Sequence, residues 1–139
     1  MFKSILLVTD NTAQSLHAAR EAGNLARAMT VSHFCIAVFY PQIPRFLGEP
    51  MIDTVTSARV GESEATAQAM HQELGILPCA VDIEILEGPG HGISQLCETH
   101  HSDLIAMGAS SLGTFAHLFH GDLSEKIVHQ AKCPVLIVR

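Results

Sequence analysis

Short apolar runs of strand length recur along the chain and alternate with segments of helical periodicity. Residues Lys3 to Thr9 and His33 to Phe39 are apolar with little regular polar alternation, and 103–107 and 134–138 repeat this pattern. Such runs are typical of parallel strands covered on both faces. Helical spacing is found between the runs, over 13–30, 52–74, 91–101 and 122–130. The alternation predicts an α/β fold, with a mainly parallel, doubly wound sheet between helices on both faces.

One of the five predicted strands differs from the others in pattern. Val81 to Leu86 reads VDIEIL, so that Asp82 and Glu84 share one face and apolar residues share the other. This alternation indicates a half-exposed strand at a sheet edge. All five strands fit one domain spanning residues 1–139, for which a single core suffices.

Charge and hydropathy exclude several classes of partner. The net charge is −6 and no Lys/Arg cluster exists, which disfavours nucleic acid as a partner. The apolar runs are far shorter than the roughly 20 residues of a membrane span, and the N-terminal run is too short for a signal peptide. We therefore expect a cytoplasmic protein with no membrane partner. The four cysteines form no CxxC pair, and we expect them to be buried thiols.

The stretch from Asp103 to Glu125 has the pattern of an anion site. An apolar strand ends at Gly108, small residues follow through Ser111, and a new helix is predicted to begin at Gly121-Asp122. Backbone N–H groups and the helix dipole favour negative charge at such a helix start. The stretch therefore points to a phosphate-bearing ligand, although a plain strand-to-helix loop is the alternative.

Two further segments belong to the same argument. If the first and fourth strands are neighbours at the switch point of the sheet, Asp10 and Gly108 face one crevice. Asp10 then contacts a ligand or, alternatively, forms an Asx turn or helix cap. Tyr40 to Pro50 contains three prolines and a glycine. We expect it to form neither helix nor strand, and it is long enough to fold over a ligand.

The whole chain resembles the universal stress protein family. The resemblance rests on ILLVTDNTAQS at the first strand, Glu87-Gly88-Pro89 after the third, DLIAMGASS at the fourth and CPVLIVR at the end. It implies a three-layer sandwich of the adenine nucleotide alpha hydrolase-like kind, usually a homodimer paired through its C-terminal strand. The resemblance also implies that this chain falls into one of the two groups of the family, of which one binds ATP and the other does not.

The phosphate pattern of the ATP-binding group is only partly present. That pattern is Gly, two residues, Gly, nine residues, then Gly followed by Ser or Thr, and here these positions hold Gly108, Ser111, Gly121 and Asp122. Ser111 in place of glycine adds a Cβ, which destabilises the loop by about 1 kcal/mol if φ must be positive at this position. It also adds a hydroxyl group that can donate a hydrogen bond to a phosphate. A carboxylate at Asp122 can cap a helix, yet it would oppose a phosphate about 4 Å away by about 4 kcal/mol. A bound Mg²⁺ would reverse that sign.

Two hypotheses on function remain. In the first, a stress-response protein binds ATP or another adenine nucleotide, with Mg²⁺ as a possible companion. The nucleotide-binding residues are then Asp10, Asn11, Val38, Met107, Gly108, Ser110, Ser111, Gly121, Asp122 and Leu123. Asp10 matches the family's nucleoside-facing aspartate, although Asn11-Thr12 replaces its Gly-Ser pair, and Val38 would lie under the base. In the second, a nucleotide-free homodimer acts through protein partners, its phosphate site altered by Ser111 and Asp122.

No catalytic or metal site is predicted. The chain lacks a convergent base, nucleophile and oxyanion set, so we expect no enzyme beyond slow nucleotide hydrolysis. His117 and His120 are three residues apart and His100 and His101 are adjacent, but no second ligand pair at a suitable spacing joins either. We therefore expect the histidines to be scattered over the surface; the alternative for His120, just before Gly121, is to reach a bound phosphate or to sense pH.

Overall fold

Five parallel strands form one sheet in the order β3-β2-β1-β4-β5. The structure, a computed structural model, describes residues 1–9, 13–88, 92–108, 127 and 129–139. The strands are β1 Ser4–Thr9, β2 His33–Tyr40, β3 Val81–Glu87, β4 Leu104–Gly108 and β5 Val135–Val138. All four described strand pairs are parallel, and β1 lies between β2 and β4. The predicted α/β sheet, the contact between the first and fourth strands, and the edge position of β3 are confirmed.

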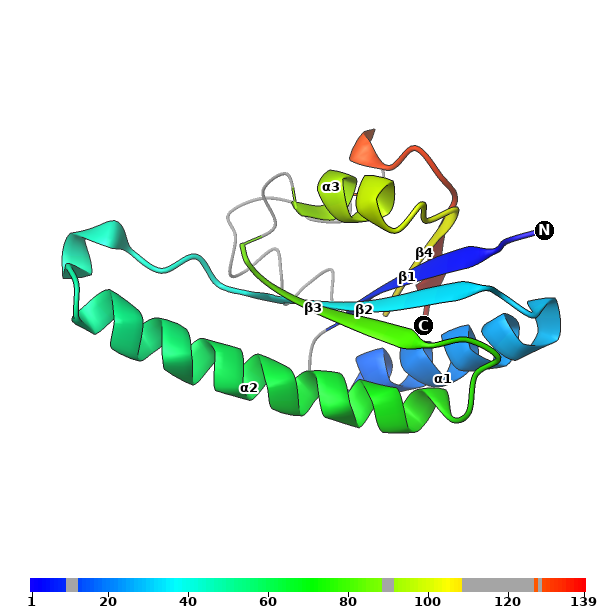
Figure 1. The fold of residues 1–139 in the computed structure, drawn as a ribbon, viewed down its shortest axis with the longest axis horizontal. Coiled ribbons are helices and arrows are strands. Elements are labelled where there is room, and N and C mark those ends of the chain that lie inside the picture. The colour runs from blue at the N-terminus through cyan, green and yellow to red at the C-terminus, as the bar shows by residue number, and fades with distance from the viewer. Residues whose placement is uncertain (10–12, 89–91, 109–126, 128) are drawn as a thin grey trace.

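Helices cover both faces of this sheet. Helices α1 (Ala13–Met29) and α2 (Met51–Leu74) pack on one face, and α3 (Gly92–Thr99) packs on the other (Figure 1). The three-layer prediction is thus confirmed, with α3 shorter than expected. Most of the helix predicted over 122–130 lies outside the described residues. None of the helices in the described part of the chain combines the length and apolar character that crossing a membrane requires.

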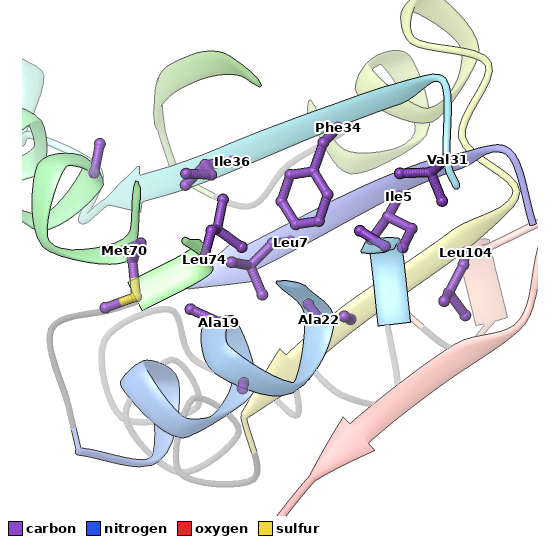
Figure 2. Close-up of a cluster of buried hydrophobic side chains, with 14 of the residues drawn as sticks. Ile5, Leu7, Ala19, Ala22, Val31, Phe34, Ile36, Met70, Leu74 and Leu104 are labelled. Carbon is purple, nitrogen blue, oxygen red and sulfur yellow. The ribbon is translucent and has the colours of Figure 1, made fainter. Parts of the chain in front are cut away.

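The central strand β1 is buried along its whole length because side chains pack on both of its faces. Ile5 and Leu7 pack toward α1 and α2, and Leu6 and Val8 pack toward α3. Figure 2 shows the larger cluster, in which Leu7 and Phe34 of the sheet lie with side chains of the two long helices. This burial on both faces explains why the strand sequences are apolar without alternating polar residues.

Helices α1 and α2 approach each other closely at a glycine. A Cβ on Gly23 would overlap the carbonyl group of Leu74, so no larger residue fits without a backbone shift. The guanidinium of Arg27 donates hydrogen bonds to the carbonyls of Leu74 and Ile76. Leu74 is the last residue of α2 and Ile76 lies just beyond it; between them Gly75, with φ 74°, terminates the helix as predicted.

Several predicted boundaries differ from the structure, and β1 and β5 each begin one residue later than predicted, at Ser4 and Val135. The segment Tyr40 to Pro50 was expected to be irregular throughout, but Tyr40 completes β2 and Arg45–Leu47 forms a 3₁₀ turn, η1. The turn is possible because the three prolines leave 45–47 free to form it. Asp103 was expected to begin the fourth strand, yet β4 starts at Leu104. The Asp103 carboxylate instead accepts hydrogen bonds from the backbone N–H groups of Lys3, at 2.8 Å, and Ser4, at 3.0 Å.

The four cysteines are free thiols. Cys35 is buried as expected, and Cys79, Cys97 and Cys133 are only partly buried. Burial, assisted by Glu84 and Asp82, raises the pKa of Cys35 to about 12. Burial and the neighbouring Cys133, with which it shares a hydrogen bond, raise the pKa of Cys97 to about 11. Both thiols therefore stay protonated near neutral pH and are poor nucleophiles.

Candidate functional site

The strand order reverses between β1 and β4. From β1 the chain moves outward to β2 and β3, and it then returns across the sheet to β4 and β5. The connection through α1 lies on one face and α3 lies on the other. In open α/β sheets, ligands bind in the crevice beyond the carboxyl ends of the strands that flank such a reversal. The carboxyl ends of β1 and β4 are therefore the first place to look for a site.

The structure brings three of the predicted site residues to this end of the sheet. Val38 pairs in register with Thr9, at the carboxyl end of β1, and is only 4% exposed. Met107 is fully buried and pairs with Val8, and Gly108 is the last residue of β4. The other predicted positions, Asp10, Asn11, Ser110, Ser111, Gly121, Asp122 and Leu123, lie outside the described residues.

A small hollow of about 140 Å³ opens beside Val38. Its wall consists of the end of β2 with Pro41 on one side and α2 on the other, through Val38, Phe39, Tyr40, Arg59, Glu62, Ser63 and Thr66. The hydroxyl of Thr66 donates to the carbonyl of Glu62, so this polar group is satisfied within α2. Ligand pockets usually measure about 300–1,000 Å³, so the hollow is at most one part of a nucleotide site.

Glu87 fastens the segment after β2 to the end of β3. Its carboxylate accepts the backbone N–H of Ile43 at 3.0 Å and two hydrogen bonds from Arg45, at 2.9 and 3.1 Å. Gly88, with φ 61°, donates its N–H to the carbonyl of Tyr40 at 2.7 Å. The sequence marked Glu87 only as part of a motif. Its partners lie 42 to 44 residues away, so spacing carried no signal of this anchor.

Beyond this anchor, the Pro-rich segment leads away from the sheet toward the start of α2 (Figure 1). Ile43 is buried, whereas Phe46 in η1 is 87% exposed. The predicted role of this segment as a cover over a ligand stays a prediction.

The histidines are not all scattered over the surface as expected. His33 and His100 meet at the amino end of the sheet, together with Asp82 and Glu84 of β3. The side chain of His100 is only 9% exposed. Residue spacing could not reveal this cluster, because its members come from three separate segments. The one local signal of this cluster in the sequence was the pair of carboxylates, Asp82 and Glu84, at alternate positions of the edge strand β3.

The comparisons with known proteins agree with this fold along the whole chain. The sequence profile of the Universal stress protein family matches residues 1–139. The chain belongs to the universal stress protein family. A universal stress protein of Thermus aquaticus, encoded in the QAH/OAS sulfhydrylase 3′ region, is 36% identical over 141 residues and is matched over 100% of both chains.

Solved structures of universal stress proteins share the fold. One, in complex with cAMP, superposes with a TM-score of 0.71 at 20% identity, over 99% of this chain and 97% of the other. Another, from Archaeoglobus fulgidus in complex with dAMP, gives a TM-score of 0.64 at 16% identity, over 98% and 97%. At these identities the likeness establishes the fold, and the bound nucleotides are properties of those two proteins.

Proposed function

We propose that this universal stress protein binds an adenine nucleotide at the carboxyl ends of β1 and β4. The observation that carries the proposal is the reversal of strand order at this place. It brings the strand that precedes Asp10 beside the strand that ends at Gly108. Two segments that the sequence marks for ligand binding thus begin from adjacent strands.

The proposed roles follow from the chemistry of each residue. Val38, apolar and at the end of β2, offers a surface for the base. Asp10 is a hydrogen-bond acceptor for the ribose hydroxyl groups. The positions from Gly108 to Asp122 retain the spacing of a phosphate-binding pattern. A Mg²⁺ ion between Asp122 and the phosphates would offset the repulsion between the two anions.

Two relatives of the same fold support the choice of an adenine nucleotide, because their structures contain cAMP and dAMP. The proposed activity is reversible binding in a stress response, with hydrolysis slow or absent. Binding of this kind would couple the nucleotide concentration to the stability of the folded state, since a ligand that binds only the native protein stabilises it.

The direct test is to denature the purified protein and to identify released nucleotide by chromatography. Calorimetric titration of the nucleotide-free protein with ATP, with and without Mg²⁺, then gives the affinity. Gly121→Val should abolish binding, because a branched side chain would block the phosphate position. Asp122→Ser should strengthen binding without Mg²⁺ and weaken the dependence on the metal.

Gly61→Val is the matched control, because Gly61 lies on the exposed side of α2 with open space around it. This variant should bind ATP as the unmodified protein does. Absence of released nucleotide, together with no measurable affinity for ATP, AMP or cAMP, would overturn the proposal. Equal affinities for Gly121→Val and Gly61→Val would show that the nucleotide binds elsewhere.

A second candidate function, a homodimer that acts through protein partners, draws on the exposed edge of the sheet. In the described chain β5 pairs only with β4, and Leu136 and Ile137 are 36% and 39% exposed. Exposed apolar residues on an unpaired edge favour association with another strand. We propose that two copies pair through β5.

Sedimentation velocity over a range of protein concentrations tests this dimer. Leu136→Arg should give a monomer, whereas Ile83→Arg should leave the dimer intact. Ile83 is the matched control, because it is 38% exposed on the opposite edge strand β3. A monomer at every concentration of the unmodified protein would contradict pairing through β5.

A further inference from the structure

Four side chains with metal-binding chemistry meet at the amino end of the sheet, opposite to the proposed nucleotide site. His33 begins β2, Asp82 and Glu84 belong to β3, and His100 follows α3. The register pairs Asp82 with Cys35 and Glu84 with Ala37. Residues paired in parallel strands share a face, so the two carboxylates lie on the face that α3 covers. The fold thus delivers two imidazoles and two carboxylates to one place.

The spacing of three of the ligand atoms suits a single small cation. The Nε2 atom of His33 is 2.8 Å from Nδ1 of His100 and 3.2 Å from Oδ2 of Asp82. Nδ1 of His100 is 3.6 Å from the same oxygen. Ligands about 2.0–2.1 Å from a tetrahedral zinc ion lie about 3.3 Å apart, a value that these three distances bracket. The two imidazole nitrogens would need to separate by about half an ångström, and Nδ1 of His100 would need to approach Oδ2 of Asp82 by about 0.3 Å.

Glu84 contacts the other ring nitrogen of His100. Its Oε1 atom is 3.3 Å from Nε2 of His100, the ring nitrogen that is not one of the three clustered atoms. A histidine that binds a metal through one nitrogen usually donates the N–H of the other to a carboxylate or carbonyl. Glu84 can accept this hydrogen bond from Nε2–H of His100, which would keep the proton on Nε2 and leave the Nδ1 lone pair free for an ion. The two carboxylates also balance the charge of a divalent cation.

The cluster is open to solvent on one side. The side chain of His100 is 9% exposed, that of His33 is 33% exposed and that of Asp82 is 49% exposed. An adjoining hollow of about 430 Å³ is lined by His33 and His100 with Lys3, Ser4, Ser32, Thr99, His101 and Asp103. An ion can therefore enter, and water can fill the fourth position of a tetrahedron whose other three ligands are protein atoms.

We propose that His33, Asp82 and His100 bind a zinc ion at the amino end of the sheet, with Glu84 orienting His100. Two imidazoles and one carboxylate, with water in the fourth position, form a ligand set that zinc adopts in proteins. The carbonyl end of α3, next to His100, adds a partial negative charge that favours a cation. The site does not depend on nucleotide binding, because it lies at the other end of the strands.

The test is calorimetric titration of the EDTA-treated, dialysed full chain with ZnCl₂, together with the visible spectrum after addition of Co²⁺. We expect a tight class of sites with one zinc per chain, and an intense tetrahedral Co²⁺ spectrum that zinc abolishes. His33→Ala and His100→Ala should each weaken this class more than about a hundredfold, and Glu84→Gln about 10- to 100-fold. His101→Ala is the matched control, because His101 is an exposed neighbour outside the ligand set.

The alternative is a hydrogen-bonded network without a metal, since neutral imidazoles can donate to each other and to a carboxylate. Equal zinc affinity in the unmodified protein, His33→Ala and His100→Ala would show that zinc binds elsewhere. That result, or the absence of tight zinc binding, would overturn the proposal. Asp82→Asn guards against loss of folding, because it preserves the shape of the side chain. It should retain the circular dichroism of the folded protein and still lose most of the zinc affinity.

Discussion

The two ends of this parallel sheet are chemically different. At the carboxyl end, β1 and β4 lead toward the residues proposed to hold phosphates, and Glu87 fastens the segment after β2. At the amino end, Asp103 accepts backbone N–H groups of Lys3 and Ser4, and two histidines meet two carboxylates. The direction of the helices contributes to this difference. In a parallel α/β sheet, helix N-termini face the carboxyl end and favour anions, and helix C-termini face the amino end and favour cations.

The largest expected effect is a loss of stability at the amino end of β2. Near the carboxyl end of the same strand, we expect a smaller loss of stability together with weaker ligand binding. Phe34 is fully buried near the amino end of this strand, and Phe34→Ala should cost about 3–5 kcal/mol of unfolding free energy in urea denaturation. Val38→Ala, near the carboxyl end, should cost about 1–2 kcal/mol, because fewer buried methyl groups are lost. It should also lower ATP affinity. A cost for Val38→Ala equal to that for Phe34→Ala would contradict this division of the strand.

The next effect concerns the carboxylate that ties β1 to the start of β4. Asp103→Ala removes the acceptor of two backbone N–H groups, so we expect a loss of about 2 kcal/mol in urea denaturation. Asp103→Asn keeps one acceptor oxygen and should lose about half as much. Nucleotide affinity should not change in either variant, because the contacts are at the amino end. A destabilisation too small to measure for Asp103→Ala would show that these hydrogen bonds contribute little.

A smaller effect is expected from the thiol of Cys97, on the side of α3. Its folded pKa is raised from 9.0 to about 11, mainly by burial, so the unfolded chain loses this proton at lower pH than the folded protein. The stabilisation is therefore complete below pH 9 and is lost as pH rises toward 11. Between about pH 8 and pH 10 the unmodified protein should lose about 1 kcal/mol more than Cys97→Ala. Parallel pH profiles of unfolding free energy would disprove this role.

The smallest effect is expected at Glu87, which binds the segment after β2 beside the carboxyl end of the sheet. Glu87→Gln weakens a half-exposed ion pair with Arg45, so we expect a loss of about 0.5 kcal/mol. Amide hydrogen exchange at Ile43 should become faster, because its N–H loses a charged acceptor. Glu73→Gln is the matched control, since Glu73 pairs with Arg20 between α1 and α2. If exchange at Ile43 responds equally to both substitutions, Glu87 is not the anchor.

The amino-acid sequence alone was enough to predict the layered α/β fold, most element boundaries and the edge position of β3. These features depend on local patterns: apolar runs for two-sided burial, alternation for an edge strand, and Gly75 for the end of α2. The family's sequence pattern also indicated a nucleotide site near Gly108. The strand order supports the position of this site, whereas the individual nucleotide-binding residues stay predictions.

Only the tertiary structure disclosed the pairing of His33 with His100, the anchor formed by Glu87, and the place of Asp103 outside β4. Each contact joins residues at least 42 positions apart. Periodicity records which face of an element is buried, but it holds no information on which other element covers that face. Strand order and helix placement decide that, because they result from packing the whole chain around a shared core.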